Sequence, residues 1–438
     1  MRLKTLILFL LPFLALQAQQ TTKHKLDSLM SHIELNQKGM GSLSIFSNGT
    51  EIYTNSIGFS SIEKSMPSNK KTKYRIASIT KTFTATLIMQ LIEEGKLSLQ
   101  TTLDKYYPEI ENADIINIKH LLQHRSGIFN FTNTSGYRRY MESYISKEDL
   151  LKQIIKLGSI FEPGDRSNYS NSNYILLTFI IEKIEGKTYK KVLEERIIKK
   201  LGLKQTYLGA EIDVTFNEAT SYTMLSDWAP TTETDMSFPL GAGALVSTST
   251  DVNKFMVALF NGKLVQMSTL EKMKEMNGRY GIGLFGFPFQ EKHGFGHSGG
   301  IDGFQSLTVY YPKDRLSVTY TSNAVDYPLK DLFDGLLSIY HDRTYEFPNF
   351  KDPQQLKIKS LESYLGRYSN PSIPQAITIF KKKNQLFAKL QGLEAVKLSA
   401  LKKHRFKNDE LELLIEFIPN ENLMILKQGT SEHELIKE

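Results

Sequence analysis

The chain has 438 residues, of which 40% are apolar, 11% aromatic and 23% charged, and this composition excludes disordered and collagen-like proteins. Its 54 basic and 47 acidic residues give a net charge of +7. This positive charge is not concentrated in one basic domain, as would be expected of a nucleic-acid-binding protein. Because it has no cysteine, the chain forms no disulfide and has no cysteine nucleophile, and its length indicates two or more domains since single cores stop growing at roughly 250–300 residues.

The N-terminal segment has the pattern of a secretory signal peptide. Arg2 and Lys4 precede an apolar run from Leu6 to Leu16, and the small residue Ala18 follows. A membrane anchor is the alternative, but this run is much shorter than the ~20 residues that a spanning helix needs. We therefore expect residues 1–18 to be removed and the mature chain to be exported, into the periplasm of a bacterium, without a membrane span.

The next segments predict a β-hairpin and a helix. Strand-like runs at 43–46 and 52–53 flank Asn48-Gly49, a pair typical of tight hairpin turns. A further strand-like segment leads into Ser78, after which apolar residues recur at helical spacing as far as Gly95.

The remainder of the first domain begins with a helical, loop-rich stretch from about 100 to 240. Strand patterns return at 306–311 and 316–321, and a helical pattern follows at 328–341. Because strands lie at both ends and helices between them, we expect one sheet that both ends of the chain complete.

The C-terminal part differs in texture. Pro348 and Pro353 mark a linker, and short strand-like runs separated by turns follow, typical of a small antiparallel sheet or barrel. The predicted organisation is therefore a main domain at 19–345, a linker at 346–356 and a small β-domain at 357–438.

Ser78-Ile79-Thr80-Lys81 is the first candidate for chemistry. This Ser-x-x-Lys spacing also occurs at Ser61, Ser68 and Ser399, so the spacing alone is not specific. Ser78 differs because it opens a predicted helix directly after a strand. The spacing places the Lys81 ammonium on the same helix face as the hydroxyl, and the helix dipole favours negative charge there. Ser78 is thus a nucleophile or, alternatively, only the cap of the helix.

Tyr169-Ser170-Asn171 is the second candidate. It follows a turn at 162–165 and precedes an apolar helical run. The turn would present Tyr169 at a surface. The alternative is an ordinary half-buried phenol.

The segment from Gly296 to Gly300 supports two incompatible interpretations. As Gly-x-Ser-x-Gly it is a nucleophile elbow with Ser298 attacking, but that motif needs a helix next, and the following residues alternate as a strand. The favoured interpretation places His297, Ser298 and Gly299 on an edge strand that lines a cleft.

His120 and His124 are spaced for a shared metal on one helix face, but no third ligand is suggested. A structural role is therefore favoured, and we expect neither a metal nor a cofactor.

Taken together, these motifs resemble the serine β-lactamase and penicillin-binding-protein superfamily, in its branch with a tyrosine second motif: class C β-lactamases, D-aminopeptidases, DD-peptidases and related esterases. The resemblance covers roughly residues 25–341, and the tail resembles the lipocalin-like barrel often appended to such enzymes. The segments that carry it are Tyr74–Phe83, Ile118–Gly127, Glu162–Tyr174 and Gly241–Thr248.

The resemblance implies a fold and a set of roles. The fold would be a three-layer α/β sandwich, with an antiparallel sheet flanked by helices and an inserted helical subdomain, followed by a small β-barrel. Ser78 would be the nucleophile, Lys81 its cationic neighbour and Tyr169 the general base, whose pKa Lys81 would hold down. The implied substrate-binding and oxyanion residues are Asn171, His297, Gly299 and Gly300, the last through its backbone N–H together with that of Ser78.

One departure shifts the expected substrate. β-Lactamases of this branch usually carry lysine at the position of His297, and a mostly neutral histidine anchors a carboxylate less well. We therefore expect a serine hydrolase acting on an amide, a D-amino-acid peptide or an ester, with a peptidoglycan-derived ligand among the candidates. A true β-lactamase, a carboxylesterase, and a penicillin-binding or cell-wall-sensing protein with little turnover are the alternatives.

Overall fold

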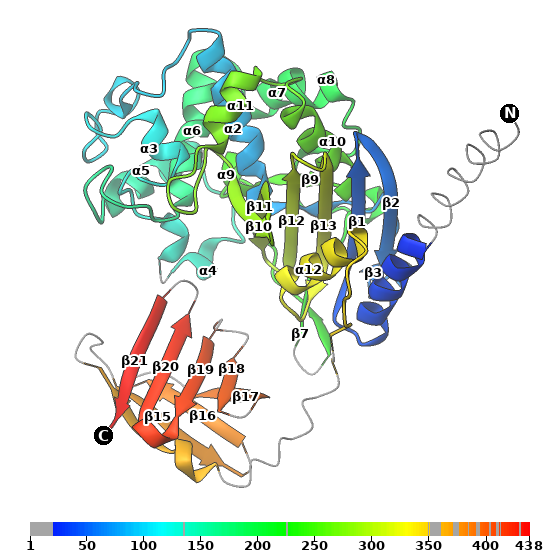
Figure 1. Ribbon diagram of the computed structural model, residues 1–438. Coiled ribbons are helices and arrows are strands. Elements are labelled where there is room, and N and C mark those ends of the chain that lie inside the picture. Colours follow the sequence, from blue (N-terminus) through cyan, green and yellow to red (C-terminus); the bar gives the residue numbers. More distant parts are fainter. Residues whose placement is uncertain are drawn as a thin grey trace, which may run out of the picture. The chain divides into compact units, whose positions relative to one another are not determined.

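The computed structural model divides the chain into two compact units, Met1–Phe347 and Pro348–Glu438, called here the N-terminal unit and the barrel (Figure 1). The predicted signal peptide and most of the predicted linker lie outside the described residues. The residues described are 21–134, 136–224, 227–348, 350, 361–370, 376–383, 385–390, 395–402, 404–408, 411, 413–428 and 431–438.

The N-terminal unit is built on a six-stranded antiparallel sheet in the order β10-β11-β12-β13-β1-β2. Strand β1, near the start of the N-terminal unit, pairs with β13, near the end of the same unit. This confirms that both ends of the main domain complete one sheet. The strands are β1 Gly39–Ser47, β2 Thr50–Ile57, β10 Phe285–Phe289, β11 Lys292–Ile301, β12 Phe304–Tyr311 and β13 Leu316–Val325.

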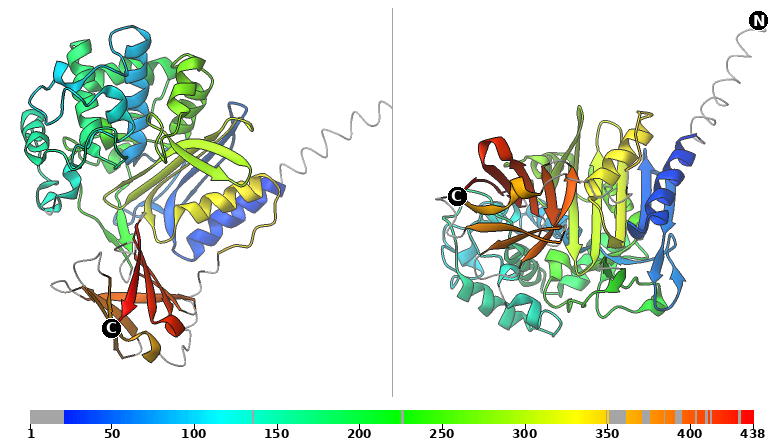
Figure 2. Two further views of the ribbon diagram at one scale, coloured as in Figure 1. Left: turned by 60° about the vertical axis from the view of Figure 1, so that its left-hand side comes forward. Right: turned by 90° about the horizontal axis from the view of Figure 1, so that it is seen from below.

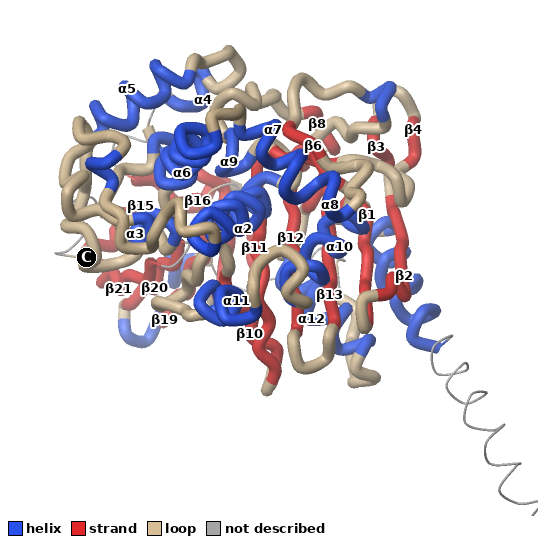
Figure 3. Tube along the Cα trace, turned by 90° about the horizontal axis from the view of Figure 1, so that it is seen from above, coloured by secondary structure: helices blue, strands red, loops and turns tan. Residues whose placement is uncertain are grey.

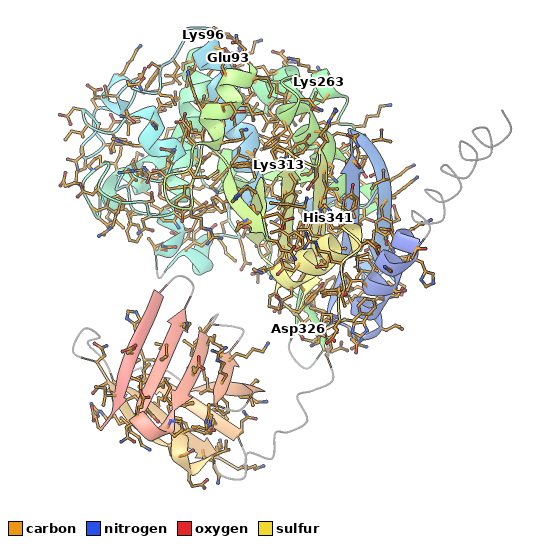
Figure 4. The ribbon with its side chains drawn as sticks, in the orientation of Figure 1. Glu93, Lys96, Lys263, Lys313, Asp326 and His341 are labelled. Carbon is orange, nitrogen blue, oxygen red and sulfur yellow. The ribbon has the colours of Figure 1, made fainter. Side chains whose placement is uncertain are left out.

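The predicted hairpin is confirmed between β1 and β2. Asn48 and Gly49 both have positive φ, +51° and +82°, as a two-residue turn with right-handed strand twist requires. At the opposite end of β1, Lys38 forms an ion pair with Asp326 just after β13 (Asp326 is labelled in Figure 4). These contacts hold the N-terminal hairpin in register against β13.

Helices cover both faces of this sheet, so the predicted three-layer α/β sandwich is confirmed. Helix α12 (Leu329–Tyr340) and the helix at 21–35 lie on one face (Figure 2). Helix α10 (Ser249–Phe260) contacts β1, β12 and β13 on the other. The side chain of Thr248 caps α10 by accepting from the backbone N–H of Asp251.

The predicted helical subdomain lies on the β11 side of the sheet, at the opposite end from β2 (Figure 3). Its central helix, α2, contacts both α6 and α9, and Phe83 of α2 stacks on Phe255 of α10 with ring centroids 3.6 Å apart. Besides α10, α12 and the helix at 21–35, the described residues form α2 Thr80–Glu93, α3 Ile118–Leu122, α4 Tyr137–Tyr140, α5 Lys147–Leu157, α6 Asn171–Glu185, α7 Tyr189–Leu193, α8 Lys199–Leu201, α9 Leu240–Gly243 and α11 Met267–Lys274.

The short strands of the N-terminal unit pair in small sheets, β3-β4, β5-β9-β6 and β7-β8. The important one is β5, because it leads directly into Ser78 and pairs with β9. The short strands are β3 Phe59–Ser61, β4 Met66–Pro67, β5 Tyr74–Arg75, β6 Tyr207–Leu208, β7 Tyr222–Met224, β8 Trp228–Pro230 and β9 Leu245–Ser247.

The C-terminal unit is a closed barrel of eight antiparallel strands, which decides between the predicted sheet and barrel. Apolar and aromatic side chains fill its interior, among them Tyr364, Phe406 and Phe417. Its strands are β14 Gly366–Ser369, β15 Ile377–Lys382, β16 Gln385–Leu390, β17 Val396–Lys402, β18 Arg405–Asn408, β19 Leu413–Ile418, β20 Leu423–Gln428 and β21 Ser431–Lys437. In neither unit do the described residues include a helix that is both long and apolar enough to cross a membrane.

Candidate active site

Ser78 lies in a tight turn between β5 and α2. The backbone N–H of Ile76 donates to Leu245, and the hydroxyl of Ser306 on β12 donates to the carbonyl of Ile76. Ala77 has φ +46°, a conformation that costs a residue with a side chain on the order of 1 kcal/mol. The chain is thus held in a strained turn immediately before Ser78.

The helix does not begin at Ser78, as the sequence predicted. Residues Ala77–Ile79 form a short 3-10 turn, and α2 begins at Thr80. Neither element is capped by a side chain, so the interpretation of Ser78 as a helix cap is wrong. Its hydroxyl contacts Lys81 and Tyr169 instead.

Lys81 is completely buried, and three oxygen atoms surround its amine. Its Nζ lies 3.1 Å from Ser78 Oγ, 2.7 Å from Asn171 Oδ1 and 2.6 Å from the carbonyl oxygen of Ala242. Three acceptors match the three donors of an ammonium group. Sequence reasoning missed Ala242, although it lies in the matching segment Gly241–Thr248.

Tyr169 reaches Ser78 from the segment before α6. Its hydroxyl lies 2.9 Å from Ser78 Oγ, and its ring centroid lies 4.9 Å from Lys81 Nζ. The fold therefore brings together Ser78, Lys81, Tyr169 and Asn171. They come from two segments of the sequence, and Lys81 and Asn171 are 90 residues apart.

Burial acts on both ionisable groups beside Ser78. It raises the pKa of the Tyr169 phenol, a rise that the hydrogen bond with Ser78 opposes, and it lowers the pKa of Lys81 well below its ordinary value. The expectation that Lys81 would hold the Tyr169 pKa below 10 is therefore wrong in direction for the free site. The physical reason is that removal from water disfavours tyrosinate and ammonium alike.

Asn171 begins α6 and is fixed from three sides. Its side-chain oxygen accepts from Lys81, its side-chain amide donates to Thr132 Oγ1 at 3.1 Å, and its backbone N–H donates to Asn130 Oδ1 at 3.0 Å. The predicted substrate-binding residue thus contacts the lysine. Asn130 and Thr132 lie outside every motif, so no local pattern pointed to them.

Strand β11 carries His297, Gly299 and Gly300 past Ser78, but it is not the edge strand that the sequence predicted. Strand β10 lies outside it, and its Gly286 and Pro288 weaken the strand pattern. The pairing with β10 stops at Gly296, so no described strand pairs with the outer edge of β11 from His297 onwards.

Gly299 has no room for a side chain. A Cβ there would lie 2.3 Å from the carbonyl oxygen of Ile76 and 3.0 Å from the backbone nitrogen of Ser78. This close approach sets the free edge of β11 against the turn that carries Ser78. Gly300, next along the strand, is exposed, and a Cβ there would meet open space.

His297 is buried and neutral. Its Nδ1 lies 2.5 Å from the carbonyl oxygen of Ser298, which only accepts, so Nδ1 carries the proton and Nε2 is left as an acceptor. Burial, followed by the positive charge of Lys81, lowers the pKa of His297 to about 3. The imidazole therefore offers a lone pair where a lysine would offer a charge.

Two alternatives from the sequence are contradicted. Ser298 lies within β11, which turns directly into β12, so the helix that a nucleophile elbow requires does not follow it. His120 accepts from the backbone N–H of Asn117 in a capping box of α3, whereas His124 lies against Tyr169. Across the part of the chain that the structure describes, no group of three or more His, Cys, Asp or Glu side chains could hold a metal ion.

Aromatic side chains that the sequence did not single out extend from Tyr169 to His297. Phe285 packs on His297 with centroids 4.1 Å apart, and Tyr280 lies 5.2 Å from Phe285 and 6.4 Å from Tyr169. Arg279 lies over the Phe285 ring at 5.2 Å.

Comparison with known proteins agrees with this geometry. The family model described as "Beta-lactamase" matches residues 34–337. The chain belongs to the β-lactamase family. It is 27% identical over 323 residues to the "Putative penicillin-binding protein PbpX" of Bacillus subtilis, covering 70% of this chain and 78% of that protein. The resemblance seen in the motifs is thereby confirmed.

Solved structures extend the likeness. A D-amino acid amidase from Ochrobactrum anthropi, complexed with L-phenylalanine amide, has a TM-score of 0.65 at 25% identity and covers 74% of this β-lactamase-family chain and 99% of its own. An octameric penicillin-binding protein homologue from Pyrococcus abyssi has a TM-score of 0.66 at 23% identity, covers 94% of this chain and 99% of its own, and supports the fold alone.

Proposed function

We propose that this protein is an exported serine hydrolase that acts through an acyl-enzyme on Ser78, with an amide, a D-amino-acid peptide or an ester as substrate. The observation that carries the proposal is the convergence on Ser78 Oγ of the Tyr169 hydroxyl at 2.9 Å and the Lys81 amine at 3.1 Å. A hydroxyl between two groups that exchange protons is the arrangement that activates a serine nucleophile.

The proton of Ser78 passes to the Tyr169–Lys81 pair. Because Lys81 Nζ lies 4.9 Å from the Tyr169 ring centroid and both groups contact Ser78 Oγ, the charge of one affects the other, and the pair loses one proton at an apparent pKa that belongs to both. As Ser78 Oγ attacks the substrate carbonyl carbon, the deprotonated pair takes its proton. The C–N or C–O bond then breaks, and the pair returns that proton to the leaving amine or alcohol.

Deacylation uses the same groups. Water gives a proton to the deprotonated pair and attacks the acyl carbon. The bond between that carbon and Ser78 Oγ then breaks, the acid leaves, and the pair returns the proton to Ser78 Oγ. Asn171 and the Ala242 carbonyl hold the Lys81 amine in place through both half-reactions.

The backbone N–H groups of Ser78 and Gly300 form the proposed oxyanion hole. The close approach of Gly299 to the Ser78 nitrogen brings β11 into range for this role. Donors aimed at a developing oxyanion are each worth ~3–4 kcal/mol of barrier.

The substrate class follows from the acceptor character of His297. A neutral imidazole with a free Nε2 receives an N–H or O–H donor, so it does not reproduce the carboxylate anchor that a lysine provides. This favours amides, peptides and esters over β-lactams. The likeness to a D-amino acid amidase supports amides as the substrate class. A peptidoglycan-derived peptide is one member of that class.

Intact-mass analysis tests the proposal. The protein is incubated separately with D-phenylalanine amide, a D-alanyl dipeptide, a short-chain p-nitrophenyl ester and benzylpenicillin, and adducts are mapped by proteolysis. Consumption of an amide, peptide or ester with a transient adduct on Ser78 supports the proposal. Turnover of penicillin alone indicates a true β-lactamase. A single equivalent of product with a lasting adduct indicates a penicillin-binding sensor.

Export is tested separately, because it depends on the leader pattern alone. The full chain is expressed in a Gram-negative host, and the periplasmic fraction is analysed by mass. A mature chain that begins near Gln19 supports export, and an uncleaved cytoplasmic chain contradicts it.

A further inference from the structure

His124 lies beside Tyr169 and is used by none of the steps above. We infer that His124 is a positioning residue that holds the Tyr169 phenol against Ser78, an inference that depends on the proposed function. The sequence offered this histidine only as half of a metal pair or as a structural residue. Its contacts in the fold assign it to Tyr169.

Two atoms of His124 bind the chain on either side of Tyr169. The backbone N–H of Asn168 donates to the carbonyl oxygen of His124 at 2.8 Å, and the backbone N–H of Ser170 donates to His124 Nδ1 at 3.2 Å. One residue therefore fixes the donors immediately before and immediately after Tyr169. Because these contacts flank its Cα, they set the direction in which the phenol leaves the backbone.

The imidazole also packs against the phenol itself. The two ring centroids lie 4.4 Å apart at an interplanar angle of 34°. Tyr174 and Tyr280 also lie against the imidazole, with centroids at 5.3 Å and 5.2 Å. The imidazole thus fills the space into which the Tyr169 ring would otherwise turn away from Ser78.

These contacts of His124 with Tyr169 and its neighbours, called here the clamp, require a neutral imidazole. An Nδ1 that accepts from Ser170 carries no proton, so the proton lies on Nε2. The groups that face His124 do not favour its charged form. Tyr169, Tyr174 and Tyr280 are uncharged, and the positive charge of Lys81 would repel an imidazolium, as would that of His297 if it were protonated. Only 2% of the residue is exposed, and it stays neutral at the pH where the pair works.

The backbone conformation of His124 provides matched variants. Its φ is +56°, in the left-handed region that glycine and asparagine adopt most readily. His124→Gly removes both the Nδ1 acceptor and the ring. His124→Asn also removes the ring but supplies an amide oxygen that can accept from Ser170. Both variants lack the ring, and the asparagine side chain restores the acceptor together with part of the lost volume.

The test uses the full chain and two probes, a fluorophosphonate that labels activated serines and p-nitrophenyl acetate. We expect His124→Gly to slow Ser78 labelling and to lower kcat by about 30-fold to 100-fold, because a misplaced phenol transfers the proton less efficiently. KM should stay within about twofold of the wild-type value. His124→Asn should recover at least about tenfold of that loss. His120→Asn is the control, because His120 lies on α3, four residues before His124, and is directed to the N-terminal cap of that helix; it should stay within about twofold of the wild type.

Equal kcat in the glycine and asparagine variants would show that His124 is only scaffold and would overturn the inference, as would wild-type kcat in His124→Gly. If the glycine variant does not fold, His124→Ala replaces it as the variant without an acceptor. Wild-type protein that forms no adduct on Ser78 overturns the proposed function and the inference with it. Labelled wild type with unaffected variants overturns the inference alone.

Discussion

The two units of this chain bury different kinds of side chain. Around Ser78 the N-terminal unit buries Lys81, His124 and His297, each with a polar partner. The barrel interior is filled by apolar side chains and by tyrosines such as Tyr364 and Tyr368. Buried polar groups are costly unless they are satisfied, and these three ionisable side chains gather around Ser78 with partners that satisfy them.

A buried ion pair extends this difference away from the site. Arg75, three residues before Ser78, donates to Asp302 Oδ2 at 2.9 Å and also pairs with Glu233. Asp302 belongs to the turn between β11 and β12. Such pairs contribute little net stability, but breaking one leaves an uncompensated charge, so this pair ties the Ser78 turn to the strand that carries Gly300.

The largest expected effect is on Ser78. Ser78→Ala removes the proposed nucleophile and should lower kcat by a factor on the order of 10³ or more, measured with whichever ester or amide is turned over. Ser298→Ala is the matched control in the same N-terminal unit and should keep measurable turnover. Labelling of Ser298 by a fluorophosphonate probe would contradict this assignment.

Tyr169→Phe should lower kcat by ~10²–10⁴ while KM changes little, because the phenol acts mainly in the transition state. Acylation should become faster as pH rises, since the pair must lose a proton. Lys81→Met leaves the Tyr169 phenol, whose pKa burial raises, as the group of the pair that must lose the proton, so the same limb should move to higher pH. Pre-steady-state rates across pH measure both effects. Wild-type kcat in Tyr169→Phe would show that another group takes the proton.

Core truncations sharpen the comparison of the two units. Phe417→Ala in the barrel removes a ring that packs 4.8 Å from Tyr364, and it should destabilise the barrel by about 3–5 kcal/mol without changing turnover. Phe255→Ala should cost the N-terminal unit a similar amount and also lower turnover, since Phe255 supports α2 and hence Lys81. Denaturant unfolding and kinetics on the same samples check this. Loss of turnover in Phe417→Ala would contradict the prediction that turnover does not depend on the barrel core.

The smallest expected effect is the pH dependence of stability from His297. Its folded pKa, about 3, lies below the ordinary value, so its contribution is present above about pH 6.5 and is lost as pH falls toward 3. The slope is at most about 1.4 kcal/mol per pH unit. His297→Gln should flatten the dependence between pH 7 and 4 in denaturant melts. An unchanged slope would indicate that the histidine is charged in the folded protein.

Local sequence patterns were enough to predict the hairpin at Asn48-Gly49, the strands β12 and β13, and the family. They also predicted the two segments that carry Ser78, Lys81, Tyr169 and Asn171. These features depend on local spacing, where turn residues and apolar periodicity act directly on the backbone. The predicted signal peptide lies outside the described residues and stays a prediction.

The distances and protonation states within the site depend on long-range packing, which local patterns do not encode. Lys81 meets the Ala242 carbonyl across 161 residues, and no local pattern encodes such a contact. The pKa of Tyr169 was predicted in the wrong direction because burial is a property of the packed fold. Strand β10 and the clamp of His124 on Tyr169 were missed for the same physical reason: both are fixed by long-range packing that overrides, or leaves no trace in, local sequence preference.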